Sequence, residues 1–345
     1  MKRFHPFAKL YQKFELMKYQ KYISTFSDPK ENETRIAKTF DGLREYDLTR
    51  ETGLYELDGA RKKRIIMLDR KYFSDYLNSI RNGDSSFVSY LDNDDIIQNN
   101  IPHNLSVFIK RDTKKNVYAE SVSSKILDFF GVSVAYYNSL KDSNLKIFSI
   151  SLDFVKPNEI FYSFFEINCN YNFNKLSEFD TIEKSVRKSI SIFSKSHILL
   201  NSKKEKDEIV KQVLYSILIR RFLLGDNDAR SGNFGILYNH KTHKIRFAPN
   251  FDLGCTFSEH PYCKKALQYL RDKYPELYYK FIEKCDEFVS INKVTGEEHY
   301  KIFLTNTIDD ENVRNNLNEK LENNLWAINK ALVEIESEKS NQTNL

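Results

Sequence analysis

The chain of 345 residues is long enough for two domains or one two-lobed domain, and 41% of its residues are apolar, so it can bury a sizeable core. Charged residues make up 29% of the chain and nearly balance, which excludes the composition of an intrinsically disordered protein. The formal net charge of +5 is concentrated in residues 1–22, where six basic side chains accompany a single acidic one.

Residues 1–50 form a basic N-terminal extension. Phe7, Leu10, Phe14 and Met17 recur at helical spacing, which predicts an amphipathic helix with a solvated basic face that docks on the body of the protein. A basic segment can also bind nucleic acid, but the apolar face favours the docked helix over direct nucleic-acid binding. Residues 26–50 are polar and receive no assignment.

Features that would direct the chain to a membrane or to the secretory pathway are not visible in the sequence. The start of the chain lacks the apolar run and the small-residue cleavage site of a signal peptide, and no stretch approaches the length of a membrane span. Four cysteines are too few to form a disulfide framework that stabilises a chain of this length. We therefore expect a reduced, cytoplasmic protein without a membrane partner.

Residues 51–160 are predicted to form a strand-rich lobe with one clear helix. The order is a strand pair over 54–68 with Asp58-Gly59 as its turn, a strand over 105–110, a helix over 118–130, and strands over 132–137 and 147–155. Gly131 is the expected cap of the helix. Residues 72–104 contain two polar stretches and are interpreted as an insertion or a mobile loop.

Residues 161–340 are predicted to be mainly helical, with helices over 207–224, 264–290 and 299–337. The last residues, 341–345, are expected to be a disordered tail. Together with the first lobe, this order predicts an α+β fold with a strand-rich N-lobe and a helical C-lobe.

The strongest chemical signal is a polar loop that runs from Gly225 to Leu237. Asp228 and Asn233 stand five positions apart on it, and Asp252 follows at the end of the next hairpin. Phosphoryl transfer needs one carboxylate near the acceptor hydroxyl and oxygen ligands that hold magnesium against the phosphates. We therefore predict Asp228 near the acceptor and Asn233 with Asp252 at the metal. Gly254 is expected to permit the turn that aims Asp252 inward.

Two further features of a phosphotransferase lie upstream. Lys110 ends a strand and Glu120 opens the following helix, so an ion pair between them could hold the lysine against the phosphates of a nucleotide. Lys71 is a weaker alternative to Lys110. Gly59, Ala60 and Arg61 are the best candidates for a loop that covers the phosphates, although an ordinary hairpin turn explains them equally well.

These residues resemble the HipA-like kinases, bacterial relatives of the protein kinase and phosphoinositide kinase fold. The resemblance spans roughly residues 54–260 and is carried by the segments 119–125, 130–132, 151–155, 225–237 and 248–252. It implies that Asp153 and Phe154 lie in the hinge between the lobes. It also implies ATP and Mg²⁺ as cofactors, Asp228 as catalytic base, Asn233 and Asp252 as magnesium ligands, and Lys110 as the ATP-phosphate lysine.

The same resemblance implies phosphorylation of serine or threonine on a protein substrate, including the kinase itself, and a toxin controlled by an antitoxin partner. Two features depart from the family: Arg230 stands where relatives often have histidine, and the phosphate loop matches poorly. Three alternatives stay open, namely a small-molecule kinase, an enzyme that transfers AMP, and a pseudokinase that acts as a binding or scaffold module.

Overall fold

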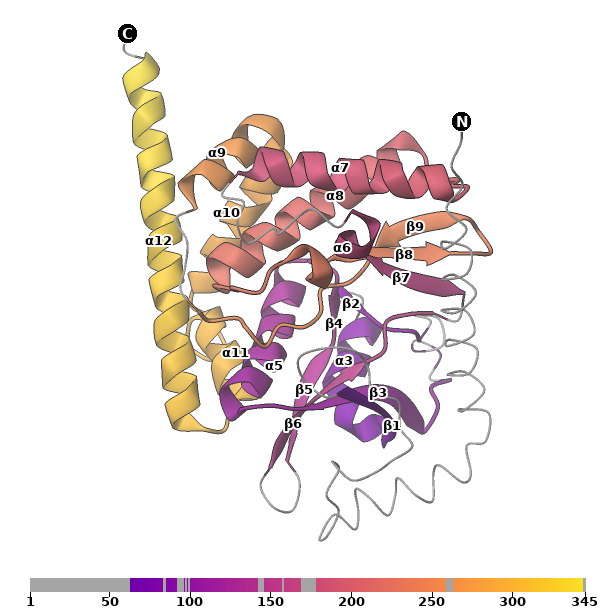
Figure 1. Cartoon of the computed structure of the whole chain (residues 1–345). Helices are drawn as coiled ribbons and strands as arrows, with labels where there is room; N and C mark the ends of the chain where they lie inside the picture. Colours follow the sequence, from indigo (N-terminus) through magenta and orange to yellow (C-terminus); the bar gives the residue numbers. More distant parts are fainter. Residues whose placement is uncertain are drawn as a thin grey trace.

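The computed structural model describes residues 63–82, 85–91, 96, 98, 100–141, 146–156, 158–168, 178–258 and 263–343. Figure 1 shows the order of the elements along the chain. The predicted basic helix, the first strand of the pair over 54–68, and the expected phosphate-loop residues Gly59, Ala60 and Arg61 all lie outside the described residues. These expectations therefore stay predictions.

A four-stranded antiparallel sheet organises the first part of the described chain. Its strands stand in the order β1 (Lys63–Asp69), β3 (Asn104–Arg111), β6 (Ile147–Leu152) and β5 (Tyr137–Lys141). In the register between β3 and β6, Lys110 lies opposite Ser149. The strands predicted over 105–110 and at the start of 147–155 are confirmed, but β6 ends at Leu152 and the segment after it is irregular.

Helix α5 (Lys114–Phe129) packs against this sheet, and its buried residues combine apolar side chains with Glu120 and three serines. It begins at Lys114 rather than at residue 118, because the Thr113 side chain accepts a hydrogen bond from the Asn116 N–H and caps the helix there. At the other end, Gly131 adopts φ 66°, a conformation that suits glycine after a helix. The predicted glycine cap is therefore confirmed.

The described part of 72–104 contains a helix, a short strand and buried side chains, so a loop over the whole segment is wrong. The polar residues 83–84 and 92–95 lie outside the described residues, and the insertion stays a prediction. The described part contains the short 3₁₀ turn Arg70–Phe73, helix α3 (Ser74–Arg81) and strand β2 (Phe87–Val88), which pairs in parallel with β4 (Val134–Ala135). Tyr76 is buried between the rings of Phe87 and Tyr136. The apolar residues Phe73, Tyr76, Leu77 and Ile80 recur at helical spacing, so the sequence carried this buried face beside the polar stretches that suggested a loop.

A second antiparallel sheet carries the loop with the predicted catalytic residues. It consists of β7 (Glu159–Ser163), β8 (Gly235–Asn239) and β9 (Lys244–Phe247), and β8 lies in the middle. The short helix α6 (Phe164–Ile167) follows β7, and the 3₁₀ turn Ser231–Asn233 leads into β8. The predicted hairpin between the polar loop and Asp252 is therefore present.

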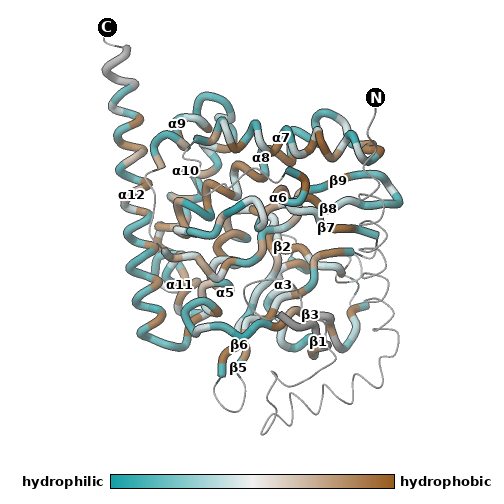
Figure 2. The backbone as a smooth tube through the Cα atoms, in the orientation of Figure 1, coloured by the Kyte–Doolittle hydropathy of each residue, from teal (hydrophilic) through white to brown (hydrophobic). Residues whose placement is uncertain are grey.

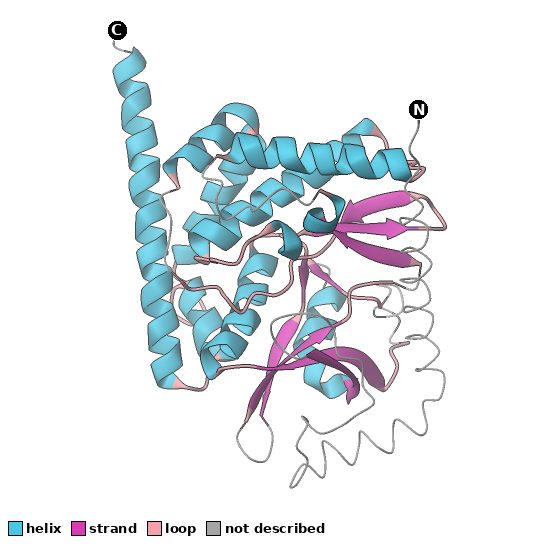
Figure 3. Ribbon diagram, in the orientation of Figure 1, coloured by secondary structure: helices cyan, strands magenta, loops and turns pink. Residues whose placement is uncertain are grey.

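Helices make up most of the remaining chain (Figure 3). They are α7 (Phe179–Ser196), α8 (Lys203–Leu218) continued by a π-helical turn (Ile219–Leu223), α9 (Lys264–Lys273), α10 (Pro275–Val289), α11 (His299–Thr307) and α12 (Glu311–Thr343). The prediction that 264–290 and 299–337 are mainly helical is confirmed, and each segment contains two helices. In the first segment Pro275, which lacks an N–H, begins the second helix.

Helix α12 runs along one side of the molecule and extends past it (Figures 1 and 2). Its buried residues recur at helical spacing, and one of them, Asn324, donates a 2.9 Å hydrogen bond to the Leu223 carbonyl at the end of the π-helical turn. This contact fastens α12 to the segment that leads into the polar loop. Among the described helices, none combines the length and the apolar composition that crossing a bilayer requires.

Replacement of Tyr76 by alanine tests whether α3 belongs to the core. Because the ring is buried and its loss leaves a cavity, we expect Tyr76→Ala to lower the free energy of unfolding by about 3–5 kcal/mol. Asn78→Ala, on the exposed face of the same helix, should change it by less than about 0.5 kcal/mol. Urea denaturation measures both, and equal stabilities of the two variants would contradict the packing described.

Candidate active site

Lys110 joins three segments that are remote in the sequence. From the end of β3, its ammonium group forms ion pairs with Glu120 on α5 and, at 3.2 Å, with the Oδ1 atom of Asp252. Lys110 and Glu120 are 7% and 1% exposed. Burial lowers the pKa of Lys110, but the two carboxylates outweigh that effect and raise it overall, so the side chain stays charged.

A pocket of about 310 Å³ opens beside this cluster. Lys110, Glu120 and Asp252 line its polar end, and the rest of its wall is mainly aromatic and includes Phe108, Phe154, Phe161 and Phe251. Phe154 and Phe251 stack with their ring centroids 5.5 Å apart. A cavity with an apolar slot at one end and a fixed cation at the other suits a ligand that has a flat ring and an anionic tail.

Asp252 is held by its backbone as well as by Lys110. It adopts φ 53°, and its N–H donates a 3.0 Å hydrogen bond to the hydroxyl of Tyr137. Burial raises the pKa of Tyr137 well above its usual range, so the phenol stays neutral and accepts this bond. The left-handed residue of this turn is thus Asp252 itself and not, as the sequence suggested, Gly254.

Gly254 instead lets the backbone pack closely against Glu120 and Lys110. A Cβ atom built at this position would lie 3.2 Å from Oε1 of Glu120 and 3.6 Å from Nζ of Lys110. The absence of a side chain therefore lets the backbone after Asp252 pass directly against the buried ion pair. This is the physical reason for a glycine two positions after the metal-binding candidate.

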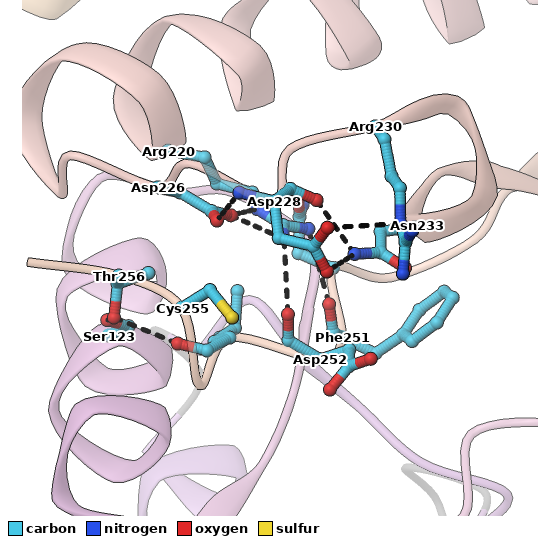
Figure 4. Close-up of polar contacts among 12 residues, drawn as sticks. Ser123, Arg220, Asp226, Asp228, Arg230, Asn233, Phe251, Asp252, Cys255 and Thr256 are labelled. Atoms are coloured by element: carbon cyan, nitrogen blue, oxygen red, sulfur yellow. Dashed lines mark hydrogen bonds and ion pairs between the residues drawn. The ribbon is translucent and has the colours of Figure 1, made fainter. Parts of the chain in front are cut away.

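Asp228 and Asn233 contact each other across the polar loop (Figure 4). The amide nitrogen of Asn233 donates to the backbone carbonyl of Asp228 at 2.8 Å and to its Oδ2 atom at 3.0 Å. The Arg230 guanidinium forms an ion pair with the other carboxylate oxygen at 3.0 Å. Because the Asn233 nitrogen is committed to Asp228, its Oδ1 atom is the one that remains for a metal ion.

Arg220 connects the two halves of the site (Figure 4). It lies in the π-helical turn and is fully buried, and its guanidinium pairs with Asp226 through Nε at 2.7 Å. Its terminal nitrogens donate to the carbonyls of Phe251 and Asp252 at 3.2 and 3.3 Å. Asp226 in turn accepts a 2.9 Å hydrogen bond from the Asp228 N–H. One ion pair therefore positions both the Asp228 loop and the Asp252 turn.

The predicted site residues form two connected groups in the structure. Lys110, Glu120, Asp153, Phe154 and Asp252 line one pocket, and Asp228 and Asn233 are joined to Asp252 through the Arg220–Asp226 pair. Lys71 is exposed on the surface and does not line this pocket. The alternative assignment of the phosphate lysine to Lys71 therefore finds no support in the geometry.

Sequence reasoning missed four contributors to the site, namely Arg220, Asp226, Tyr137 and Ser149. Arg220 gave one usable signal, because a charged residue inside the apolar run 217–224 must be paired if that helix is buried. The others gave none, since a tyrosine or a serine within a strand and an aspartate in a polar loop are ordinary. Tyr137 contacts Asp252, more than a hundred residues away, whereas Asp226 contacts the nearby Arg220 and Asp228.

The donor set fits magnesium that is bound together with a nucleotide. Magnesium prefers oxygen ligands and commonly takes only one or two from the protein, with phosphates and water as the others. Asp252 and the Asn233 amide oxygen meet that requirement. Within the described ranges, no group of three or more His, Cys, Asp and Glu side chains could hold a metal ion alone.

Comparisons with known proteins give only distant likenesses. No protein-family model matches the chain, and no curated protein matches it in sequence. A solved structure of the Helicobacter pylori proinflammatory kinase CtkA matches with 14% identity and a TM-score of 0.42, covering 66% of this chain and 91% of that one.

A second solved structure contains the Shewanella oneidensis MR-1 toxin–antitoxin system HipA and HipB with its operator DNA. It matches with 9% identity and a TM-score of 0.45, covering 87% of this chain and 71% of that one. Scores of this size carry no argument about activity, so we base the functional proposal on the side-chain geometry.

Substitution of Arg220 tests its role as the link within the site. Arg220→Leu leaves Asp226 buried without its partner, and we expect a loss of about 3–5 kcal/mol in the free energy of unfolding. The double variant Arg220→Leu/Asp226→Leu removes both charges and should lose less than the single variant. Urea denaturation distinguishes these cases, and a double variant that is less stable than the single one would contradict the assignment.

Proposed function

We propose that this chain is an ATP- and magnesium-dependent phosphotransferase with a two-lobed, protein-kinase-like fold. The single observation that supports this proposal most is the meeting of Lys110, Glu120 and Asp252 at the polar end of one pocket. A lysine paired with a helix carboxylate, and next to a second carboxylate, suits the phosphates of a nucleotide and the metal that accompanies them.

In this proposal Lys110 binds the phosphates as a fixed positive charge. Its pairing with Glu120 keeps the ammonium group in the pocket before the nucleotide arrives, so little rearrangement is needed. The base of the nucleotide lies against the aromatic part of the pocket wall, which includes Phe154 and Phe251. Magnesium held by Asn233 and Asp252 would neutralise charge on the phosphates.

Asp228 acts at the acceptor hydroxyl. Its carboxylate accepts the proton of the hydroxyl while the acceptor oxygen forms a bond to the terminal phosphorus of ATP and the bond to the ADP oxygen breaks. The contacts with Arg230 and Asn233 orient the carboxylate. The most suitable acceptor is the serine or threonine hydroxyl of a protein, including this chain.

The sequence also allows a small-molecule kinase, an enzyme that transfers AMP and a pseudokinase. A small-molecule kinase would use the same residues, and transfer of AMP would require the nucleotide to bind in the opposite direction. A pseudokinase usually lacks one of the chemical groups, whereas Asp228, Asn233 and Asp252 are all in place. A toxin role with an antitoxin partner belongs to the proposal through the sequence resemblance alone, and a cytoplasmic location through the composition and cysteine usage of the chain.

Asp228→Asn tests the assigned base. Because the amide cannot accept a proton, we expect transfer to fall by at least about 100-fold, while ATP affinity stays within about threefold of the wild type. Labelled ATP incubated with a cell lysate, followed by mass spectrometry, measures the transfer and distinguishes an added phosphate from an added AMP. Asp272→Asn, an exposed residue on α9, is the matched control. Normal turnover by Asp228→Asn would refute the assignment.

Asp252→Asn tests the metal site. We expect it to abolish the part of ATP affinity that depends on magnesium, since a neutral amide binds magnesium far more weakly than a carboxylate does. Calorimetric titration of ATP with and without magnesium measures this dependence. A wild-type protein whose ATP affinity does not respond to magnesium would overturn the metal assignment, and absence of any ATP binding would favour the pseudokinase.

A further inference from the structure

The position of Glu120 depends on helix α5, because few polar contacts of its own hold the side chain. One carboxylate oxygen, Oε1, pairs with Lys110. The other, Oε2, is buried, and among the described residues it has no hydrogen-bond partner. Glu120 therefore keeps Lys110 in the pocket as long as α5 itself is held in place. A contact that fixes the first half of α5 would act on the nucleotide site without touching the nucleotide.

The opposite face of α5 packs against α11 and α12 (Figure 1). Tyr118 precedes Glu120 by two positions, and at about 100° per residue their side chains leave the helix about 200° apart. Lys114 lies four positions before Tyr118 and therefore shares its face. Its ammonium group pairs at 3.0 Å with Asp310, in the segment 308–310 between α11 and α12. Contacts on this face therefore support α5 from behind Glu120.

Asp309 is the acceptor at the centre of this face. One of its carboxylate oxygens accepts a hydrogen bond from the Tyr118 hydroxyl, and the other pairs with Lys141 at the end of β5. Tyr118 is 1% exposed, and burial together with the neighbouring carboxylate raises the pKa of its phenol, which keeps its proton and donates. Asp309 thus joins α5 to the sheet that carries Lys110.

The segment 308–310 is itself held by the start of α12. The Asp310 side chain accepts a 3.2 Å hydrogen bond from the Val313 N–H, and the Arg314 guanidinium donates to the Ile308 carbonyl at 3.3 Å. Ile308 is 1% exposed, so its side chain anchors the segment in the core. Because both ends of the segment are anchored, its middle residue offers a fixed acceptor to α5.

We propose that Asp309 is a positioning residue, which holds α5 through Tyr118 and so keeps Glu120 in place at the nucleotide site. The inference rests on the proposed function, because it concerns the phosphate side of the same pocket. Without the Asp309 carboxylate, the buried Tyr118 hydroxyl would lose its acceptor, which is costly, so the first half of α5 would shift. Such a shift moves Glu120 away from Lys110 and leaves the ammonium group with Asp252.

Calorimetry of the full chain tests the proposal with Asp309→Ala. The Asp309 side chain is 60% exposed, so the substitution leaves the core unchanged. We expect MgATP and magnesium tripolyphosphate to bind about five- to tenfold more weakly, the effect of one hydrogen bond. Adenosine should bind as it does to the wild type, because the aromatic wall of the pocket does not belong to α5. Glu311→Ala removes the same charge from an exposed side chain two positions away and is the matched control, with unchanged affinities.

The dependence on Glu120 separates positioning from a general loss of stability. In a Glu120→Ala background, Asp309→Ala should weaken MgATP binding by less than about twofold, because no carboxylate remains to be positioned. An equal loss in both backgrounds, or weaker adenosine binding by Asp309→Ala alone, would assign Asp309 a merely structural role and overturn the inference.

Tyr118→Phe tests the route from Asp309 to α5 without a change at the ion pair. The variant keeps the buried ring and loses the hydroxyl, so we expect MgATP to bind about two- to threefold more weakly. Wild-type affinity in this variant, or in Asp309→Ala, would refute the inference and leave the phosphotransferase proposal intact. Failure of the wild type to bind MgATP would refute the inference and the proposed function together.

Discussion

The candidate site depends on one buried arginine. Arg220 is fully buried, so its charge must be compensated where it lies, and the Asp226 carboxylate is the compensating group. The remaining donors of the guanidinium then hold the carbonyls of Phe251 and Asp252, while Asp226 holds the backbone of the Asp228 loop. Its face also stacks over the Phe234 ring, directly after Asn233. Compensation of the buried Arg220 charge therefore fixes the positions of Asp228, Asn233 and Asp252 relative to one another.

Sequence reasoning located site residues where a chemical pattern of side chains coincided with the expected local order of strands and helices. Asp228, Asn233 and Asp252 could be found because a polar loop, a hairpin and a second carboxylate follow one another within thirty residues. Lys110 and Glu120 could be found because a strand that ends on a lysine precedes a helix with an inward acid. These are short-range patterns, and the structure brings Lys110, Glu120 and Asp252 to one pocket.

What the sequence could not show depends on contacts between distant segments. The partner of the α3 face, Tyr136, lies sixty residues away from Tyr76 and could not be identified from the sequence. The conformation of Asp252 and the close packing at Gly254 depend on Tyr137 and Glu120, so the sequence assigned Gly254 a turn role that Asp252 itself fills. The hydrogen bonds that the N–H groups of 155 and 156 donate to Asp153 and Glu159 likewise form only in the folded chain.

The most direct measurement is a crystal structure of the full chain with magnesium and a non-hydrolysable ATP analogue. The account predicts phosphates against the ammonium group of Lys110, magnesium bound by Asn233 and Asp252, and the base against the aromatic pocket wall that includes Phe154 and Phe251. The carboxylate of Asp228 should face the terminal phosphate across the space for an acceptor hydroxyl. A nucleotide bound outside this pocket, or a metal ion that contacts neither Asn233 nor Asp252, would contradict it.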